Sequence, residues 1–93
     1  MLIGTIIGNV WATRKIEDLN GCKLMIVEPY QYEGHTKPYP IVAVDTIGGG
    51  IGEVVLVVSG SSARVCLGDG NKPIDHMIVG IVDKVELQAE KKE

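Results

Sequence analysis

Apolar and polar residues alternate weakly along the first segment of the chain, from Leu2 to Arg14. Successive side chains of a strand point to opposite faces, so this alternation predicts a strand. Glycines on the apolar face suit a strand that curves tightly around a small barrel. Ile3, Thr5, Ile7, Asn9 and Trp11 share the other face. The predicted inward face consists of Leu2, Gly4, Ile6, Gly8, Val10 and Ala12.

Turn signals separate this strand from the segments that follow it. Asn20-Gly21 tolerates positive φ at both positions and predicts a hairpin with a second strand over Lys23–Val27. The stretch Glu28–Pro40 holds three of the four prolines and predicts a loop or a ragged edge, because proline cannot donate to a strand ladder. Strand character returns over Ile41–Ile47, and Gly48-Gly49-Gly50 then breaks it.

Two later runs, Glu53–Ser59 and Met77–Val82, are apolar without alternation. Such runs are typical of strands that are buried on both faces. The chain has little helical sequence to cover a second face, apart from one short helical turn predicted at Gly60–Arg64 with a serine as N-cap. We therefore expect neighbouring copies of the same chain to provide the cover.

Composition supports an all-β fold and an oligomer. Ile and Val dominate, Phe is absent and 45% of the 93 residues are hydrophobic. A domain of this size buries only about 60% of the surface that its unfolded chain exposes, so the surplus apolar surface suggests contact between subunits. We assign residues 1–86 to one domain and residues 87–93 to a charged C-terminal tail.

Charge and hydropathy argue against two classes of partner. The net charge of −3 lacks the basic footprint of a nucleic-acid-binding protein. No apolar run approaches the roughly 20 residues of a membrane-spanning helix, and the N-terminus lacks the basic region of a signal peptide. Cys22 and Cys66 form no CxxC pair, so we expect reduced, buried thiols rather than a disulfide.

The residues with chemical potential do not form a recognisable site. The cluster from Gly48 to Glu53 does not spell the dinucleotide-binding motif, and a strand follows it in place of a helix. Ser61, Ser62, Asp75 and His76 include the ingredients of a hydrolytic triad, but no nucleophile elbow surrounds either serine. We expect backbone capping from these serines and no enzymatic activity.

A metal site is equally unsupported by the sequence. His35, His76, Cys22 and Cys66 are scattered and lack the spacing of metal ligands. We therefore predict no metal, and no other motif calls for a cofactor.

Six short blocks follow one another in order over nearly the whole chain, roughly residues 1–86, and as an ordered set they are specific. They are Gly4-x-x-x-Gly8-x-Val10-x-Ala12-Thr13-x-Lys15, Leu19-x-Gly21-x-Lys23-Leu24, Val42-Ala43-Val44-Asp45-x-x-Gly48-x-Gly50-x-Gly52-Glu53-x-Val55-Leu56-Val57, Gly60-Ser61-Ser62-Ala63-Arg64, Pro73-x-Asp75 and Ile78-Val79-Gly80-Ile81-Val82-Asp83. With these blocks the chain resembles the vertex proteins of bacterial microcompartment shells, of the carboxysome and ethanolamine-utilisation type. Gly49 departs from the family, which more often has alanine there.

The resemblance implies a small five-stranded β-barrel, similar to an OB-fold, that assembles as a homopentamer. It implies a structural shell protein in the bacterial cytoplasm, which caps five-fold vertices among hexameric shell proteins and carries no catalytic residue. A hexamer remains open. The expected axial or inter-subunit loop is Gly48, Gly49, Gly50, Ile51, Gly52 and Glu53, and the expected interface residues are Val55, Val57, Ser61, Ser62, Arg64, Ile78 and Ile81.

A second functional hypothesis comes from the barrel itself. Small barrels of this type often bind single-stranded nucleic acid or glycans through stacked aromatic side chains. Trp11 and the tyrosines of the 28–40 stretch are the residues that such a module would use. A basic, aromatic-lined groove would distinguish this binding module from a shell subunit.

Overall fold

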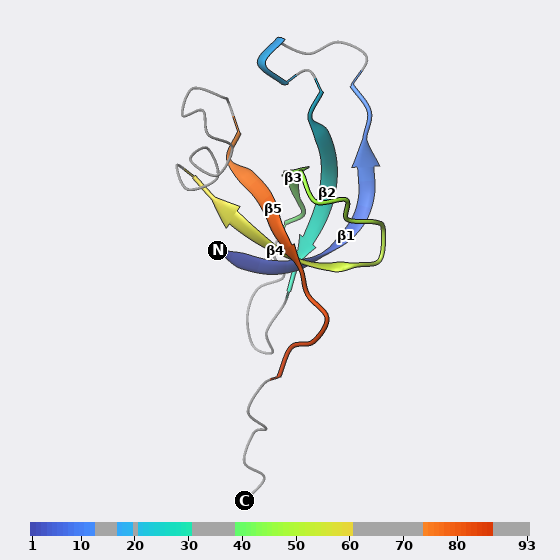
Figure 1. The fold of residues 1–93 in the computed structure, drawn as a ribbon, viewed down its shortest axis with the longest axis vertical. Helices are drawn as coiled ribbons and strands as arrows, with labels where there is room; N and C mark the ends of the chain where they lie inside the picture. The colour runs from blue at the N-terminus through green and yellow to red at the C-terminus, as the bar shows by residue number, and fades with distance from the viewer. Residues whose placement is uncertain (13–16, 20, 31–38, 61–73, 87–93) are drawn as a thin grey trace, which may run out of the picture.

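The protein is a five-stranded β-barrel in the part of the chain that the structure describes. The computed structural model describes residues 1–12, 17–19, 21–30, 39–60 and 74–86. Figure 1 shows how the strands wrap around one another. The all-β barrel prediction is confirmed. The strands are β1 (Leu2–Val10), β2 (Lys23–Pro29), β3 (Ile41–Asp45), β4 (Val54–Ser59) and β5 (His76–Ile81), and a 3₁₀ turn, η1 (Glu17–Leu19), precedes β2.

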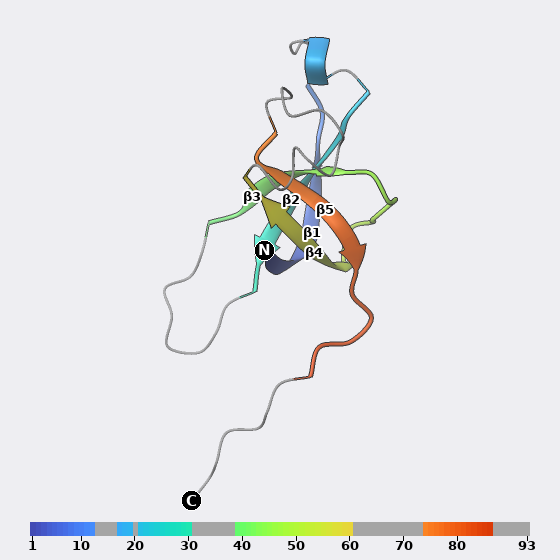
Figure 2. The ribbon, with the colours of Figure 1, turned by 60° about the vertical axis from the view of Figure 1, so that its left-hand side comes forward.

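The barrel closes in the order β1-β2-β3-β5-β4, which returns to β1. β1 is antiparallel to β2 along one edge and to β4 along the other. The parallel seam between β3 and β5 is short, with the pairs Val44–Met77 and Asp45–Ile78. Figure 2 shows β5 crossing the front of the barrel beside β4. A small five-stranded barrel is also the architecture of the OB-fold.

β1 can curve tightly around the barrel because its inward face carries glycine. Gly4 and Ile6 are buried and Ile7 is exposed, as the alternation predicts up to that point. The register shifts between Ile6 and Gly8, so that Asn9 pairs with the core residue Met25, and the predicted alternation does not continue past this bulge. A Cβ on Gly4 would lie 2.5 Å from Val27 Cγ1 and 2.7 Å from the Glu28 carbonyl oxygen. The two strands can therefore approach this closely only with glycine at position 4.

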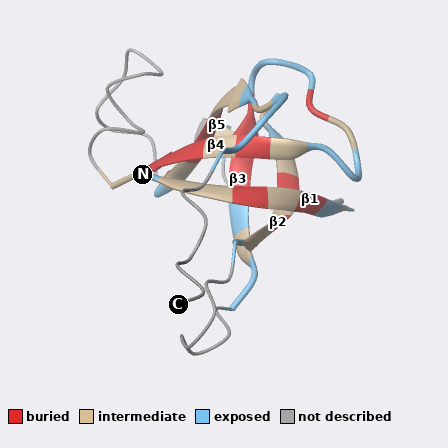
Figure 3. Ribbon diagram, turned by 90° about the horizontal axis from the view of Figure 1, so that it is seen from below, coloured by how far each residue is buried: buried red, intermediate tan, exposed pale blue. Residues whose placement is uncertain are grey.

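The core lies inside the barrel and consists mainly of β-branched side chains. Figure 3 marks the buried positions in red along the strands of the barrel. The residues of this cluster are Ile6, Met25, Val27, Ala43, Val55, Val57 and Ile78. A second buried cluster of Val44, Val58, Ile74 and Met77 extends it. Stiff β-branched side chains pack well on the concave surface of a pleated sheet.

The boundaries differ from the sequence prediction in places. β2 continues through Glu28 to Pro29, because a proline at the last position of a strand gives up only a terminal donor. β3 ends at Asp45, before the predicted limit of Ile47. Of the helical turn predicted at Gly60–Arg64, the structure describes only Gly60, which has φ +65° and follows β4 in a turn.

A buried carboxylate holds the loop between β3 and β4. Asp45 Oδ1 accepts hydrogen bonds from the backbone N–H groups of Ile47 (3.0 Å) and Gly48 (3.1 Å), and Oδ2 accepts one from Gly49 (2.7 Å). The Asp45 side chain is fully buried, and the Lys23 ammonium lies 3.7 Å from Oδ2. Three charge-assisted bonds to consecutive donors fix the start of the loop on the barrel wall.

The three glycines of the loop serve different purposes. Gly48 has φ +86°, which favours glycine. A Cβ on Gly49 would lie 2.8 Å from Ile6 Cδ1, so this residue packs against the core. A Cβ added to Gly50 would make only an ordinary van der Waals contact, because its nearest neighbour, Glu53 Oε1, would be 3.6 Å away.

The end of the loop forms hydrogen bonds within the loop and with β1. Glu53 Oε1 accepts a hydrogen bond of 2.7 Å from the Gly50 N–H. The Gly52 N–H donates to the Ile6 carbonyl at 2.8 Å, and the Ile6 N–H donates to the Glu53 carbonyl at 2.9 Å. The segment 45–53 is thus a loop whose conformation is held by hydrogen bonds at both ends.

Replacing Gly4 with alanine should destabilise the barrel. The added Cβ would overlap the β2 backbone, and we expect the free energy of unfolding to fall by about 1–3 kcal/mol. Gly8→Ala is the matched control in the same strand, because the nearest atom to its Cβ would be 3.5 Å away. It should change stability by less than about 0.5 kcal/mol. Urea denaturation at one fixed chain concentration makes the comparison. Equal effects of the two variants would contradict the close approach at Gly4.

Removing the Asp45 carboxylate should loosen the loop and weaken the fold. Asp45→Ala leaves three backbone donors without their acceptor, at an expected cost of about 3 kcal/mol or more. Asp45→Asn should cost less, because its carbonyl oxygen can keep the bonds to Ile47 and Gly48. Glu53→Ala removes one exposed bond and should cost about 1 kcal/mol. Urea denaturation gives the ranking, and a Glu53 effect as large as that of Asp45→Ala would refute it.

Candidate assembly surface

Several residues that the sequence analysis assigned to a subunit interface lie in the core instead. Val55, Val57 and Ile78 have 0% exposed surface in the single chain. Their side chains point into the barrel and have no surface left to bury against another copy. This is a correction of the interface prediction. Its cause is that the apolar runs of β4 and β5 also alternate between an inner and an outer face, although both faces are apolar.

Part of the interface prediction concerns side chains that are accessible in the single chain. Ile81 at the end of β5 is exposed, and Val54 and Leu56 on β4 are half-buried. The side chains of Ile81, Val54 and Leu56 are therefore available for an outside contact. Ser61, Ser62 and Arg64 lie outside the described residues.

The glycine loop presents one apolar side chain to solvent. Ile51 is 63% exposed at the tip of the loop, between the fixed points at Asp45 and Glu53. Gly48, Gly52 and Glu53 are also exposed, whereas Gly49 is buried and Gly50 is half-buried. Of the loop residues named from sequence, Ile51 is the one whose apolar side chain is accessible.

Large apolar side chains lie exposed elsewhere on the barrel. Trp11 is 89% exposed just after β1. The exposed set comprises Met1, Ile7, Trp11, Tyr30, Tyr39, Val42, Ile47, Ile51, Ile81 and Val85.

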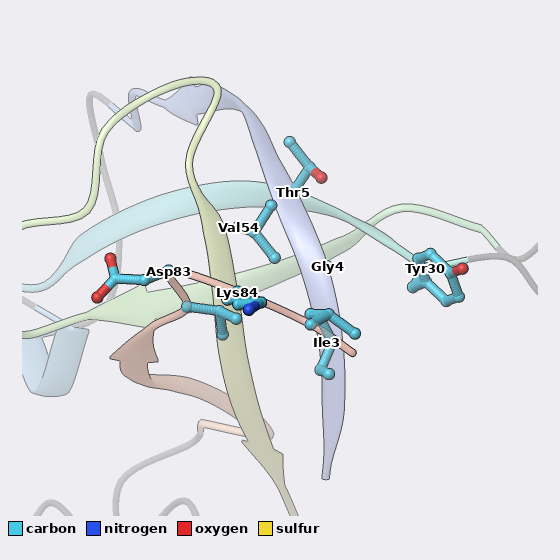
Figure 4. Close-up of a pocket in the computed structure, with 9 residues that line it drawn as sticks. Ile3, Gly4, Thr5, Tyr30, Val54, Asp83 and Lys84 are labelled. Atoms are coloured by element: carbon cyan, nitrogen blue, oxygen red, sulfur yellow. The ribbon is translucent and has the colours of Figure 1, made fainter. Parts of the chain in front are cut away.

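Two hollows on the surface are lined in part by these side chains, the first by Tyr30 and Val85 and the second by Trp11 and Ile51. The first, which we call the Tyr30 groove, has a volume of about 340 Å³ and lies beside the start of β1 (Figure 4). The second, the Trp11 face, encloses about 580 Å³ beside the end of β1. The Tyr30 groove is lined by Ile3, Gly4, Thr5, Tyr30, Val54, Val82, Asp83, Lys84 and Val85, and the Trp11 face by Asn9, Val10, Trp11, Ala12, Cys22, Lys23, Leu24, Met25, Gly49, Gly50 and Ile51.

The walls of the Tyr30 groove are held by backbone hydrogen bonds. The Tyr30 N–H donates to the Ile3 carbonyl at 2.8 Å, and the Val82 N–H donates to the Val54 carbonyl at 2.8 Å. These bonds hold the residues after β2 and after β5 beside β1 and β4. In Figure 4, Tyr30 and Asp83 lie at opposite ends of the view, with Ile3 and Val54 between them.

The polar side chains of the described residues form pairs and not a catalytic arrangement. Ser59 Oγ lies 3.1 Å from His76 Nδ1, and the two residues are cross-strand partners on β4 and β5. Their hydrogen bond links neighbouring strands at the barrel edge. No three His, Cys, Asp or Glu side chains among the described residues are grouped to hold a metal ion. His35 and Cys66 lie outside those residues, and Cys22 is a half-buried free thiol. In the same part of the chain, no helix has the length and apolar character needed to cross a bilayer.

Comparison with known proteins matches the chain over most of its length. A family model described as "Ethanolamine utilisation protein EutN/carboxysome" matches residues 1–83. The bacterial microcompartment shell vertex protein GrpN of Rhodospirillum rubrum is 46% identical over 90 residues, which cover 92% of this chain and 97% of the relative. The carboxysome shell vertex protein CcmL of Synechocystis is 39% identical over 87 residues, covering 94% and 87% of the two chains.

Solved structures agree with these sequence relatives. The GrpN pentameric microcompartment shell protein from Rhodospirillum rubrum superposes with a TM-score of 0.81 at 42% identity, covering 95% of this chain and all of the other. The pentameric shell protein of the RMM microcompartment gives a TM-score of 0.79 at 36% identity, with 98% and 100% covered. The match of the family model, the sequence identity and the barrel together show that the chain belongs to the EutN/CcmL family of microcompartment proteins.

Proposed function

We propose that the chain is a structural subunit of a bacterial microcompartment shell, and that five copies form a ring that closes the five-fold vertices. The observation that carries this proposal is the match over residues 1–83 to a family whose relatives described above are shell vertex proteins. Solved members with the same barrel are pentameric shell proteins. The chain works inside the bacterial cytoplasm as part of that shell.

The surface of the barrel supports assembly. A 93-residue barrel with Trp11, Ile51 and Tyr30 exposed presents aromatic and aliphatic side chains of the kind that anchor protein interfaces. In a ring, each subunit uses two different surfaces, one for each neighbour. The interface candidates that we retain are Ile51 in the glycine loop and Ile81 on β5.

We infer a purely structural role, with no catalysis and no cofactor. The relatives are named as shell proteins, and the only described pair of a hydroxyl and an imidazole, Ser59–His76, links two strands. The domain that performs this role is residues 1–86, and residues 87–93 form an appended charged tail.

The alternative of a nucleic-acid or glycan-binding module finds no support. A strand of nucleic acid requires a basic groove with aromatic stacking. Lys84 at the edge of the Tyr30 groove is paired with Glu86 at 2.7 Å, and Asp83 lines the same groove. Lys23 on the Trp11 face lies beside the Asp45 carboxylate. Neither hollow therefore carries the excess of positive charge that phosphates need.

The partners that this role requires are hexameric shell proteins. A sheet of six-fold tiles is flat, and a closed polyhedron needs five-fold units at its corners. The pentamer would therefore be a minor component, present only at vertices. Its contact with hexamers would complete a barrier that retains an intermediate and keeps cofactor pools apart.

The assembly proposal predicts one oligomeric species. Native mass spectrometry of the untagged chain at micromolar concentration should give a mass of five subunits, each of 10.0 kDa. A stable interface buries about 800 Å² on each partner, and every subunit of the ring makes two such contacts. A six-subunit mass would replace the pentamer with a hexamer. A monodisperse monomer would overturn the ring altogether.

The vertex proposal predicts a defect in shell closure. Shells assembled from matching hexameric proteins without this chain should be elongated or open at the corners, and adding the chain should close them. Electron microscopy gives shell shape, and leakage of an encapsulated small dye measures the seal. Sealed polyhedral shells without any pentameric protein would refute the vertex role.

The control for closure is a chain that folds but does not form the ring. A charged substitution at a core position such as Val57 is unsuitable, because that side chain is fully buried and its loss would unfold the barrel. An exposed position tests the ring without the core, so Ile51→Asp is the appropriate variant. It should remain folded by circular dichroism and fail to close shells.

A further inference from the structure

We propose that the Tyr30 groove of one copy receives the Trp11 face of the next copy around the ring. This inference rests on the proposed pentamer and adds to it the two surfaces that meet. Trp11 and Ile51 are the inserted side chains. The receiving wall is Ile3, Tyr30, Val54 and Val85.

Ring symmetry makes a second copy the partner that fits both hollows. A cyclic assembly with more than two members joins subunits head to tail, so each subunit needs two unlike and complementary surfaces. The described residues offer two such surfaces, one beside Ile3–Thr5 at the start of β1 and one beside Asn9–Ala12 at its end. They are separated along one continuous strand, which allows both to be occupied at once.

The Trp11 face is itself a hollow, but two apolar side chains of its lining are exposed and can reach a neighbour. Trp11 and Ile51 are 89% and 63% exposed, the largest aromatic and an aliphatic side chain on the same hollow. The loop that carries Ile51 is fixed by the Asp45 carboxylate and by the bond between Gly50 and Glu53. A surface that is already ordered loses less conformational entropy when it binds.

The Tyr30 groove is the smaller of the two hollows, at about 340 Å³, and its lining is mainly apolar. Ile3, Val54 and Val85 supply aliphatic side chains to it, and Figure 4 shows Tyr30 at the opposite end of the view from Asp83. Among the charged groups of its rim, Lys84 is already paired with Glu86, which leaves the Asp83 carboxylate. On the Trp11 face, the partly exposed Lys23 ammonium is likewise paired, 3.7 Å from Asp45 Oδ2. Head-to-tail contact therefore sets apolar surface against apolar surface.

The chain contains a natural reporter for this contact, since Trp11 is its only tryptophan. In the assembled ring, Trp11 emission should shift to shorter wavelength and acrylamide should quench it poorly. Dilution below the dissociation concentration should return it to the emission of an exposed indole. The same samples are measured by native mass spectrometry. A ring in which Trp11 remains fully quenchable overturns this inference and leaves the pentamer standing, whereas a monomer at every concentration overturns the pentamer itself.

A matched pair of variants tests the receiving groove. Val85→Asp places a carboxylate in the groove, next to Asp83, and should raise the concentration for half-dissociation by about 30-fold or more. Val42→Asp is the control, because Val42 is similarly exposed (48% against 45%) and lines neither hollow. It should keep the ring and the shifted Trp11 emission. Circular dichroism shows that both chains are folded.

A cross-link distinguishes this groove from any other site that could cover Trp11. With Cys22 and Cys66 both replaced by serine, Ile51→Cys and Val85→Cys in the same chain should form disulfides between neighbouring copies under mild oxidation. Ile51→Cys combined with Val42→Cys should not. If Trp11 is shielded in the ring but Val85→Asp leaves assembly unchanged, or if the control pair cross-links as efficiently, the Tyr30 groove is not the receiving surface.

Discussion

The close contact between β1 and β2 at Gly4 is the constraint on which the barrel depends. β1 bonds to β2 and β4 at once, and it turns from one to the other within nine residues. At Gly4 the strands approach so closely that a methyl group would overlap the Glu28 carbonyl. That approach brings Ile6 into the centre, where it meets Val27 and Val55 and supports Gly49 of the loop. Barrel closure and loop position therefore share one origin.

The shape of the surface follows from this small radius. Five short strands around a narrow core leave room inside for few side chains, so the remaining apolar residues face outward. Ile7 faces outward because Ile6 occupies the inner face of the same strand, and Trp11 is exposed beyond the end of that strand. The exposed apolar surface is thus a consequence of the fold, and it becomes useful only when other subunits cover it.

The sequence predicted what depends on local pattern and missed what depends on three-dimensional proximity. The burial of Gly4 and Ile6 and the break at Gly48 follow from alternation and from glycine conformation, and both are found. The bulge after Ile6, which ends the predicted alternation, has no local signal in the sequence. The runs containing Val55, Val57 and Ile78 have no period, so sequence could not show that these side chains point inward. Nor could it place Ile51 beside Trp11, because 40 positions separate them and the Asp45 hydrogen bonds bring them together.

Asp45 connects the inside of the barrel with its outer surface. A carboxylate that accepts three backbone hydrogen bonds is satisfied without solvent, so it is tolerated beside the core. The same bonds fix the start of the loop that carries Ile51 on the outer surface, six residues along the chain from Asp45. An apolar side chain on a rigid loop contributes to binding without an ordering cost, whereas the same side chain on a loose loop would lose that advantage. The residue that stabilises the single chain is therefore also the one that prepares it to assemble.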